Sequence, residues 1–242
     1  NIIIPASMMT NFCYYSLISF RHRHFPAFRS QQQAFFYKFI NHGIFHLQPV
    51  TKVYIVDDEL KSNHPIIVKL GQAFAEVKLF KKASDAIAAI KESLGNKVIL
   101  LLDLKLSGGE SGYRTLASLR NLSYQIPVII WTGLDEKTSE FFSLINLKTY
   151  AIRDKVESTD KMVELVKQAD ADMNYSLSNA LERWIMAQPG NHDDIFAVST
   201  GGETISLNQM LDEVRKDTPK GKEFTQDLVN LTIELMKKEH HE

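Results

Sequence analysis

The chain has little cysteine and no long uninterrupted apolar run. Its single cysteine, Cys13, excludes an internal disulfide framework, which suits a reducing cytoplasm. Residues 1–20 are largely apolar, but Pro5 and several polar residues interrupt them, so they do not predict a membrane span. No internal repeat or low-complexity tract is present. We therefore expect a cytoplasmic protein without a membrane segment, and 242 residues suffice for one or two domains with sizeable cores.

Acidic residues are absent from the start of the chain. Residues 1–51 contain four Lys or Arg and no Asp or Glu, whereas residues 52–175 contain 17 of each sign. Residues 176–242 contain seven basic and 12 acidic residues. We expect the basic segment 1–50 to be an irregular N-terminal extension outside the folded domain. An acid-free start that carries Arg and Ser also fits a transit peptide or a membrane-surface segment.

Carboxylates follow two apolar runs of the chain. Asp57 and Asp58 come directly after the run 53–56. Asp103 comes directly after the run 98–102. Such runs are typical of buried parallel strands, and open α/β sheets bind ligands beyond the carboxyl ends of their strands. Three converging carboxylates repel one another unless a cation is present, and Mg²⁺ prefers oxygen ligands of this kind. The alternative is that the adjacent acids only cap the following helix.

Two later strand candidates end in side chains that complement the carboxylates. The apolar run 127–131 is followed by Thr132, and a weaker strand at 149–153 is closely followed by Lys155. Counted from Asp58, successive sites are 45, 29 and 23 residues apart, and each interval has room for a crossover helix and a strand. A Thr or a Lys at one strand end is ordinary by itself. The ordered set of five residues indicates a site.

This set resembles a response-regulator receiver domain of two-component signalling over about residues 51–175. The resemblance implies an α/β fold with a five-stranded parallel, doubly wound, flavodoxin-like sheet, followed here by a small, mostly helical C-terminal extension. Strands are expected near 52–56, 76–80, 97–102, 127–131 and 149–153. Helices are expected near 60–73, 84–94, 112–121, 135–145 and 159–187.

The resemblance also implies a role for each matching residue. Asp103 corresponds to the phosphate acceptor of the family. Asp58 corresponds to the direct Mg²⁺ ligand, and Asp57 to the acid that acts largely through water. Thr132 corresponds to the hydroxyl that turns towards the phosphoryl group. Lys155 corresponds to the lysine that pairs first with the acceptor and then with a phosphoryl oxygen.

The chain departs from the family pattern in its loops. Ser107 and Val156 stand where the family usually has proline. The loop after Asp103 is one residue longer than usual and reaches Gly112. The backbone carbonyl of Lys105 is implied as a further Mg²⁺ ligand, and its side chain can either reach the phosphoryl group or point to water.

The C-terminal segment, residues 176–242, continues past a receiver domain. An apolar stripe along the fifth helix runs from Met173 to Trp184 at spacings of four, four and three residues. This stripe either packs within the chain or forms a dimer seam. A small hairpin and two amphipathic helices are expected to follow, and Ser206 and Gln209 form a capping-box pattern at the start of the first helix.

Charge argues against DNA binding by these two helices. The second helix contains Glu223, Asp227 and Glu234, whereas contact with phosphates needs a basic face. We therefore expect segment 176–242 to be a protein-docking or dimerisation module, in a family that we do not recognise.

Together these features predict a response regulator. A histidine kinase or phosphotransfer protein would phosphorylate Asp103 with Mg²⁺, and the C-terminal segment would signal through a protein partner or a homodimer. We expect no enzymatic activity beyond slow self-dephosphorylation. The alternatives are a degenerate receiver used as a scaffold, a DNA-binding response regulator and an Asp-nucleophile phosphatase. The phosphatase would place its nucleophile in a D-x-D motif after the first strand, whereas Asp103 follows the third.

Overall fold

The computed structural model describes residues 2–3, 50–107, 111–133, 141–186, 190–199 and 204–239. The chain divides into two compact units. The first, called the α/β unit below, comprises Gln48–Arg183 and Arg215–Asp217. The second, called the C-terminal unit below, comprises Asn1–Leu47, Trp184–Val214 and Thr218–Glu242.

A five-stranded sheet forms the centre of the α/β unit. Its strands are β2 (Thr51–Val56), β3 (Glu76–Phe80), β4 (Lys97–Leu102), β5 (Val128–Thr132) and β6 (Ala151–Asp154). They lie in the order β3-β2-β4-β5-β6, and every neighbouring pair is parallel. Numbered within this sheet, the order is 2-1-3-4-5, which is the doubly wound order of flavodoxin-like folds. The predicted fold class is confirmed.

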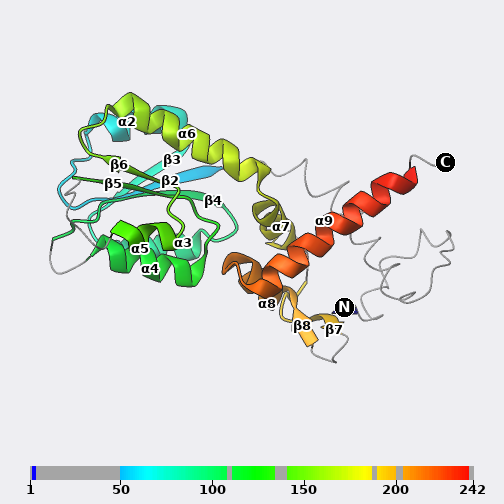
Figure 1. Cartoon of the computed structure of the whole chain (residues 1–242). Coiled ribbons are helices and arrows are strands. Elements are labelled where there is room, and N and C mark those ends of the chain that lie inside the picture. The colour runs from blue at the N-terminus through cyan, green and yellow to red at the C-terminus, as the bar shows by residue number, and fades with distance from the viewer. Residues whose placement is uncertain are drawn as a thin grey trace. The chain divides into compact units, whose positions relative to one another are not determined.

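Helices cover both faces of the sheet. They are α2 (Pro65–Ala73), α3 (Ala83–Glu92), α4 (Gly112–Leu122), α5 (Phe141–Asn146) and α6 (Thr159–Tyr175). In Figure 1, α2 and α6 lie on one face of the sheet, and α3, α4 and α5 lie on the other. This arrangement buries the central strands on both sides and leaves the loops at the carboxyl edge free to form a site.

The central strand β4 is almost entirely apolar because helices cover it on both faces. All six of its residues are buried. Leu100 and Leu102 pack towards α3, α4 and α5, whereas Ile99 and Leu101 pack towards α2 and α6. Because successive side chains of a strand point to opposite faces, a strand covered on both sides needs apolar residues at every position.

The structure contains two helices where the sequence analysis predicted one helix over 159–187. α6 ends at Tyr175 and α7 (Leu177–Met186) begins after Ser176. Ser176 has φ −76° and ψ 118°, and its Oγ accepts a hydrogen bond from the Asn179 N–H at 3.3 Å. The prediction of one helix over 159–187 was wrong, because Ser176 leaves the helical conformation and caps the helix that follows.

The apolar stripe along these helices is buried within the chain. Met173, Leu181 and Trp184 are 5%, 0% and 4% exposed. Met173 and Leu181 belong to the α/β unit and Trp184 to the C-terminal unit, and the dimer-seam interpretation stays a prediction.

A three-residue segment from later in the chain completes the α/β unit. Arg215 pairs with Glu182 at 2.6 Å, and both side chains are about one-tenth exposed. The Glu182 carboxylate also accepts a hydrogen bond from the Gly95 N–H at 3.0 Å. The Arg215 carbonyl accepts one from the Tyr124 N–H at 2.7 Å, and Asp217 pairs with Lys148. The pairing of Glu182 satisfies a carboxylate that would otherwise be costly to bury.

The C-terminal unit contains a small antiparallel sheet and two helices. Its elements are β1 (Ile2–Ile3), β7 (Ile195–Ser199), β8 (Thr204–Ser206), α8 (Leu207–Arg215), whose last residue belongs to the α/β unit, and α9 (Pro219–Glu239). β7 pairs with β8, which confirms the predicted hairpin, and β7 also pairs with β1. The predicted irregular extension therefore contains two residues of strand, and residues 4–49 lie outside the described part of the chain.

Ser206 and Gln209 form the predicted capping box at the start of α8. The Ser206 N–H donates to Gln209 Oε1 at 2.8 Å, and the Gln209 N–H donates to Ser206 Oγ at 3.2 Å. Two donors at the helix start are thereby satisfied reciprocally. Across the described residues, every helix is too short or too polar to cross a bilayer.

Candidate functional site

The three predicted carboxylates meet at the carboxyl edge of the sheet. Val56 of β2 pairs with Leu102 of β4, so Asp57 and Asp103, the next residues of the two strands, leave the sheet at the same level. Each of Asp57, Asp58 and Asp103 offers a carboxylate oxygen, and these oxygens lie within 4.8 Å of one another. Asp57 is 1% exposed and Asp103 is 4% exposed. The predicted acidic cluster is therefore present and mostly buried.

Asp57 is fixed by the loop that follows it. Its Oδ1 accepts hydrogen bonds from the N–H groups of Glu59 at 3.0 Å and Leu60 at 2.7 Å. These bonds hold a local turn. Helix α2 begins later, at Pro65, and His64 is its N-cap, so Asp57 does not cap that helix. The other oxygen of Asp57, Oδ2, is buried and accepts no hydrogen bond.

Asp103 is held by two donors on one side and by a lysine on the other. Its Oδ1 accepts hydrogen bonds from Thr132 Oγ1 at 2.7 Å and from the Lys105 N–H at 3.0 Å. Its Oδ2 forms an ion pair with Lys155. Thr132 ends β5 and is 2% exposed. The Lys105 side chain is exposed, which agrees with the interpretation in which it points to water.

Lys155 provides a positive charge beside the cluster. Besides its pair with Asp103, its Nζ lies 2.8 Å from Asp57 Oδ2, at ion-pair distance but without hydrogen-bond alignment. Burial acts to lower the pKa of Lys155. The hydrogen bond to Asp103 and the negative charges of Asp103 and Asp57 outweigh burial and hold this pKa above its usual value. Lys155 is therefore a fixed cation at neutral pH.

Asp58 is held by the loop that follows β4. Its Oδ2 accepts a hydrogen bond from the Ser107 N–H at 3.1 Å, and its Oδ1 is buried without a hydrogen bond. Hydrogen bonding by Ser107, its side chain first, lowers the pKa of Asp58 against the opposing effect of burial, and the charge of Lys155 lowers it further. This carboxylate is therefore ionised and ready to bind a cation.

The three carboxylates share one pattern. Each has one oxygen held by N–H or O–H donors, and the other oxygen is left for a cation. In Asp58 this second oxygen is buried without a hydrogen bond, which is costly for a charged group. In Asp57 and Asp103 it forms an ion pair with Lys155. Mg²⁺ binds to a few carboxylates and keeps several waters, so this donor set fits Mg²⁺.

Two contacts that position Asp58 were not predicted from the sequence. The Ser107 N–H is a backbone donor, which no side-chain pattern reveals. Lys81, in the loop after β3, donates through Nζ to the carbonyl oxygen of Asp58 at 3.1 Å and also to that of Leu60. A lysine in a polar loop is ordinarily solvated, so its sequence context carries no signal of this contact.

Gly112, at the start of α4, packs directly on the backbone of Asp103. Its N–H donates to the carbonyl oxygen of Leu104 at 3.2 Å. A Cβ atom at Gly112 would lie 2.3 Å from the carbonyl oxygen of Asp103 and 2.5 Å from Leu104 Cα. Both contacts are with backbone atoms, so a side chain at this position cannot be accommodated without moving the chain at Asp103.

We expect Gly112→Ala to lower the free energy of unfolding by about 1–3 kcal/mol, as overpacking does. Urea unfolding measures the change. Gly71→Ala is the matched control, because a Cβ at Gly71 in α2 would meet no atom within 4 Å and alanine favours the helix. Equal stability of the two variants would contradict the close packing of Gly112.

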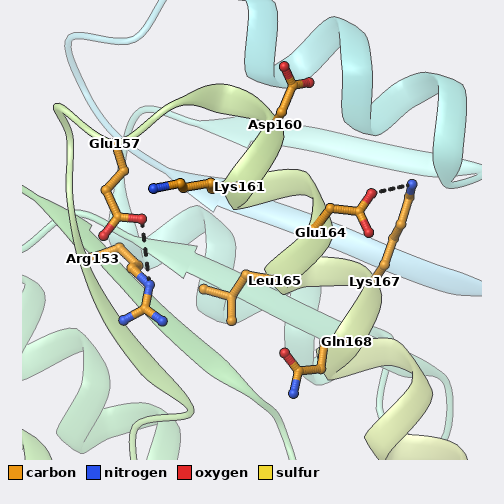
Figure 2. Close-up of a pocket in the computed structure, with 8 residues that line it drawn as sticks. All are labelled: Arg153, Glu157, Asp160, Lys161, Glu164, Leu165, Lys167 and Gln168. Carbon is orange, nitrogen blue, oxygen red and sulfur yellow. Dashed lines mark hydrogen bonds and ion pairs between the residues drawn. The ribbon is translucent and has the colours of Figure 1, made fainter.

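A separate hollow lies over β6 and α6, away from the carboxylates. Figure 2 shows its lining, which comes from β6, α6 and the loop between them. Arg153 and Glu157 are 3.7 Å apart, and Lys167 and Glu164 are 2.8 Å apart. None of the predicted site residues lines this hollow. Four of its charged residues form these two surface ion pairs, so the hollow offers no chemistry comparable to that of the acidic edge.

Comparison with known proteins identifies similar structures only. A scan against protein-family models found no match, and a search of curated proteins found none either. A CheY-like receiver domain from Methanospirillum hungatei is 22% identical over 52% of this chain and 98% of that chain, with a TM-score of 0.45. The receiver domain of NtrX from Brucella abortus is 21% identical over 49% and 97% of the two chains, with a TM-score of 0.41. FixJ-N is 23% identical over 52% and 96%, with a TM-score of 0.44.

These structures are response-regulator receiver domains, and the similarity covers about half of the chain. The class of fold follows from the strand order itself, which is that of flavodoxin and CheY. The C-terminal part of the chain is unassigned.

Proposed function

We propose that this protein is a response regulator and that its α/β unit is the receiver. In this proposal a histidine kinase or a phosphotransfer protein donates a phosphoryl group to Asp103. The observation that supports it is the meeting of five side chains at one edge of the sheet. They are Asp57, Asp58, Asp103, Thr132 and Lys155.

The main obstacle to the proposed reaction is repulsion between the Asp103 carboxylate and the anionic phosphoryl group. Positive charge at the site would reduce this repulsion. Asp103 needs no base, because a carboxylate is ionised at pH 7. The incoming phosphoryl group is also anionic, so both partners must be neutralised. Mg²⁺, when held by Asp57, Asp58 and Asp103, would supply this neutralisation. Lys155, already in contact with two carboxylates, contributes the remaining positive charge.

The proposed transfer exchanges one bond to phosphorus for another. An oxygen of Asp103 forms the new bond to phosphorus. The bond between phosphorus and the donor breaks, and its electron pair leaves with the donor. We expect the acyl phosphate to be lost by slow self-dephosphorylation rather than by enzymatic turnover.

Phosphorylation would redirect the partners of Asp103. The new group adds about 1.5 to 2 negative charges. Thr132 Oγ1, which now donates to Asp103, and Lys155 can both donate to the phosphoryl oxygens. Thr132 lies at the end of β5 and Lys155 follows β6, so their movement would bias the side of the unit that contains α5, β6 and α6.

Output through protein contacts is the second part of the proposal. Leu207, Met210, Leu211 and Phe224, from the apolar faces of α8 and α9, are buried within the chain. The acidic charge of segment 176–242 disfavours DNA and favours a protein partner, including a second copy. A conformational change caused by phosphorylation of Asp103 would pass from α6 to α7 across the cap at Ser176 rather than along one continuous helix.

Incubation with acetyl phosphate and Mg²⁺ tests the proposal on the full chain. Intact-mass analysis should show one added phosphoryl group, and chelation of Mg²⁺ should prevent it. Size-exclusion chromatography and partner capture, with and without acetyl phosphate, report any change in assembly. A chain that gains no mass would instead be a scaffold. Specific, salt-sensitive DNA binding would favour a DNA-binding regulator.

A further inference from the structure

Asp58 is held between two neighbouring loops. From the loop after β4, the Ser107 N–H donates to Asp58 Oδ2 at 3.1 Å. From the loop after β3, Lys81 Nζ donates to the backbone carbonyl of Asp58 at 3.1 Å. The lysine fixes the backbone of Asp58, and the Ser107 N–H fixes its carboxylate. Position and orientation of the carboxylate are thus set separately.

The loop after β4 contacts two carboxylates through alternate N–H groups. The Lys105 N–H donates to Asp103 Oδ1 at 3.0 Å, and two residues later the Ser107 N–H donates to Asp58 Oδ2. The same loop is tied back by the bond from the Gly112 N–H to the carbonyl of Leu104. One short segment therefore links the carboxylate of Asp58 to that of Asp103.

The Ser107 contact determines which oxygen of Asp58 is available. With Oδ2 engaged by the N–H, the buried oxygen without a hydrogen bond is Oδ1. A carboxylate free to rotate would have to be ordered when a cation bound, and a carboxylate already oriented would not.

We propose that Ser107 is a positioning residue of the metal site. Its backbone N–H holds Asp58 Oδ2 and so presents Oδ1 to the cation. The inference rests on the proposed function, in which that cation is Mg²⁺. The Ser107 group that donates to Asp58 with hydrogen-bond geometry is the backbone N–H, so the inference concerns this N–H, and the hydroxyl is tested separately.

Substitutions at residue 107 separate the backbone donor from the side chain. Ser107→Pro removes the N–H, whereas Ser107→Ala keeps it and removes the hydroxyl. Calorimetric titration of the full chain with Mg²⁺ should give a dissociation constant about 10-fold higher for Ser107→Pro, the effect of losing one hydrogen bond to a charged group. We expect Ser107→Ala to stay within about threefold of the unaltered chain, because the N–H bond is retained. Equal constants for the two variants would overturn the inference.

A double-mutant comparison excludes a general distortion of the loop by proline. In an Asp58→Asn background, Ser107→Pro should cause little further loss of Mg²⁺ affinity, because Ser107 acts through the Asp58 carboxylate. A full additional loss in that background would show that proline acts by distorting the loop and would overturn the inference. If the unaltered chain bound no Mg²⁺, the proposed function itself would fail. Binding that Ser107→Pro leaves unchanged would overturn the positioning role alone.

Amide hydrogen exchange by NMR tests the contact without any change at residue 107. We expect Asp58→Ala to remove the protection of the Ser107 amide while leaving that of the Lys105 amide, which donates to Asp103. This result would support the contact even if Ser107→Pro did not fold. Unchanged protection of Ser107 in Asp58→Ala would show that the bond to Asp58 does not hold this loop.

Discussion

Asp103→Asn is expected to abolish the phosphoryl mass that acetyl phosphate and Mg²⁺ add to the chain. The amide is neutral and a poor nucleophile, so it cannot form the acyl phosphate. The substitution also removes the charge that pairs with Lys155, while the hydroxyl of Thr132 can still donate to the amide oxygen. The fold should therefore survive, and intact-mass analysis should show an unlabelled, folded protein.

The matched control for this variant is Asp160→Asn. Asp160 pairs with Lys69 on the surface, and its side chain is 77% exposed. Its loss removes the same charge without touching the acidic edge, so labelling should equal that of the unaltered chain. Label that persists in Asp103→Asn would move the acceptor to another residue. Label lost in both variants would point to an effect of net charge.

Arg120→Met is expected to lower the free energy of unfolding by about 3–5 kcal/mol, the cost of breaking a buried charged network. Arg120 is 2% exposed in α4. Its Nε donates to the carbonyl of Leu147 at 2.7 Å, and one terminal nitrogen donates to that of Lys148 at 3.0 Å. The other terminal nitrogen donates to the carbonyls of Ser123 at 3.1 Å and Ile126 at 2.9 Å.

Burial lowers the pKa of Arg120 to about 10, against the smaller opposing effect of Tyr124. The guanidinium remains charged at neutral pH, and its loss leaves buried carbonyl groups without donors. Urea unfolding measures the cost. Arg114→Met is the control, because Arg114 lies in the same helix and is exposed, and we expect it to change stability by no more than about 0.5 kcal/mol. Equal stability of the two methionine variants would contradict the role assigned to Arg120.

The sheet and the candidate site could be predicted because both depend on one regular feature. Buried parallel strands must be apolar on both faces, so β4 is visible in the sequence. The residue after such a strand lies at the carboxyl edge, which is why Asp57 and Asp103 could be placed together before the structure was known. The position of each acid directly after its strand is a local feature of the sequence, so it can be recognised without knowledge of the tertiary contacts.

The features that were missed depend on contacts that no periodic pattern records. The apolar spacing continues smoothly through Ser176, yet a single serine cap divides the helix there. Arg120 has the sequence context of an exposed helix residue, but irregular turns supply its carbonyl partners. Ser107 contributes through its backbone N–H, which every residue except proline possesses.

Lys155 bears on whether the chain needs a metal ion in order to fold. Its contacts with Asp57 and Asp103 give the acidic cluster an internal counter-ion, so folding does not have to wait for Mg²⁺. In many small metal-binding domains, by contrast, the metal contributes the folding free energy itself, and chelators unfold them. Here Mg²⁺ would add only the stabilisation of an ordinary ligand, set by its concentration relative to its dissociation constant. Under the proposed function, Mg²⁺ would then bind and dissociate without unfolding the α/β unit.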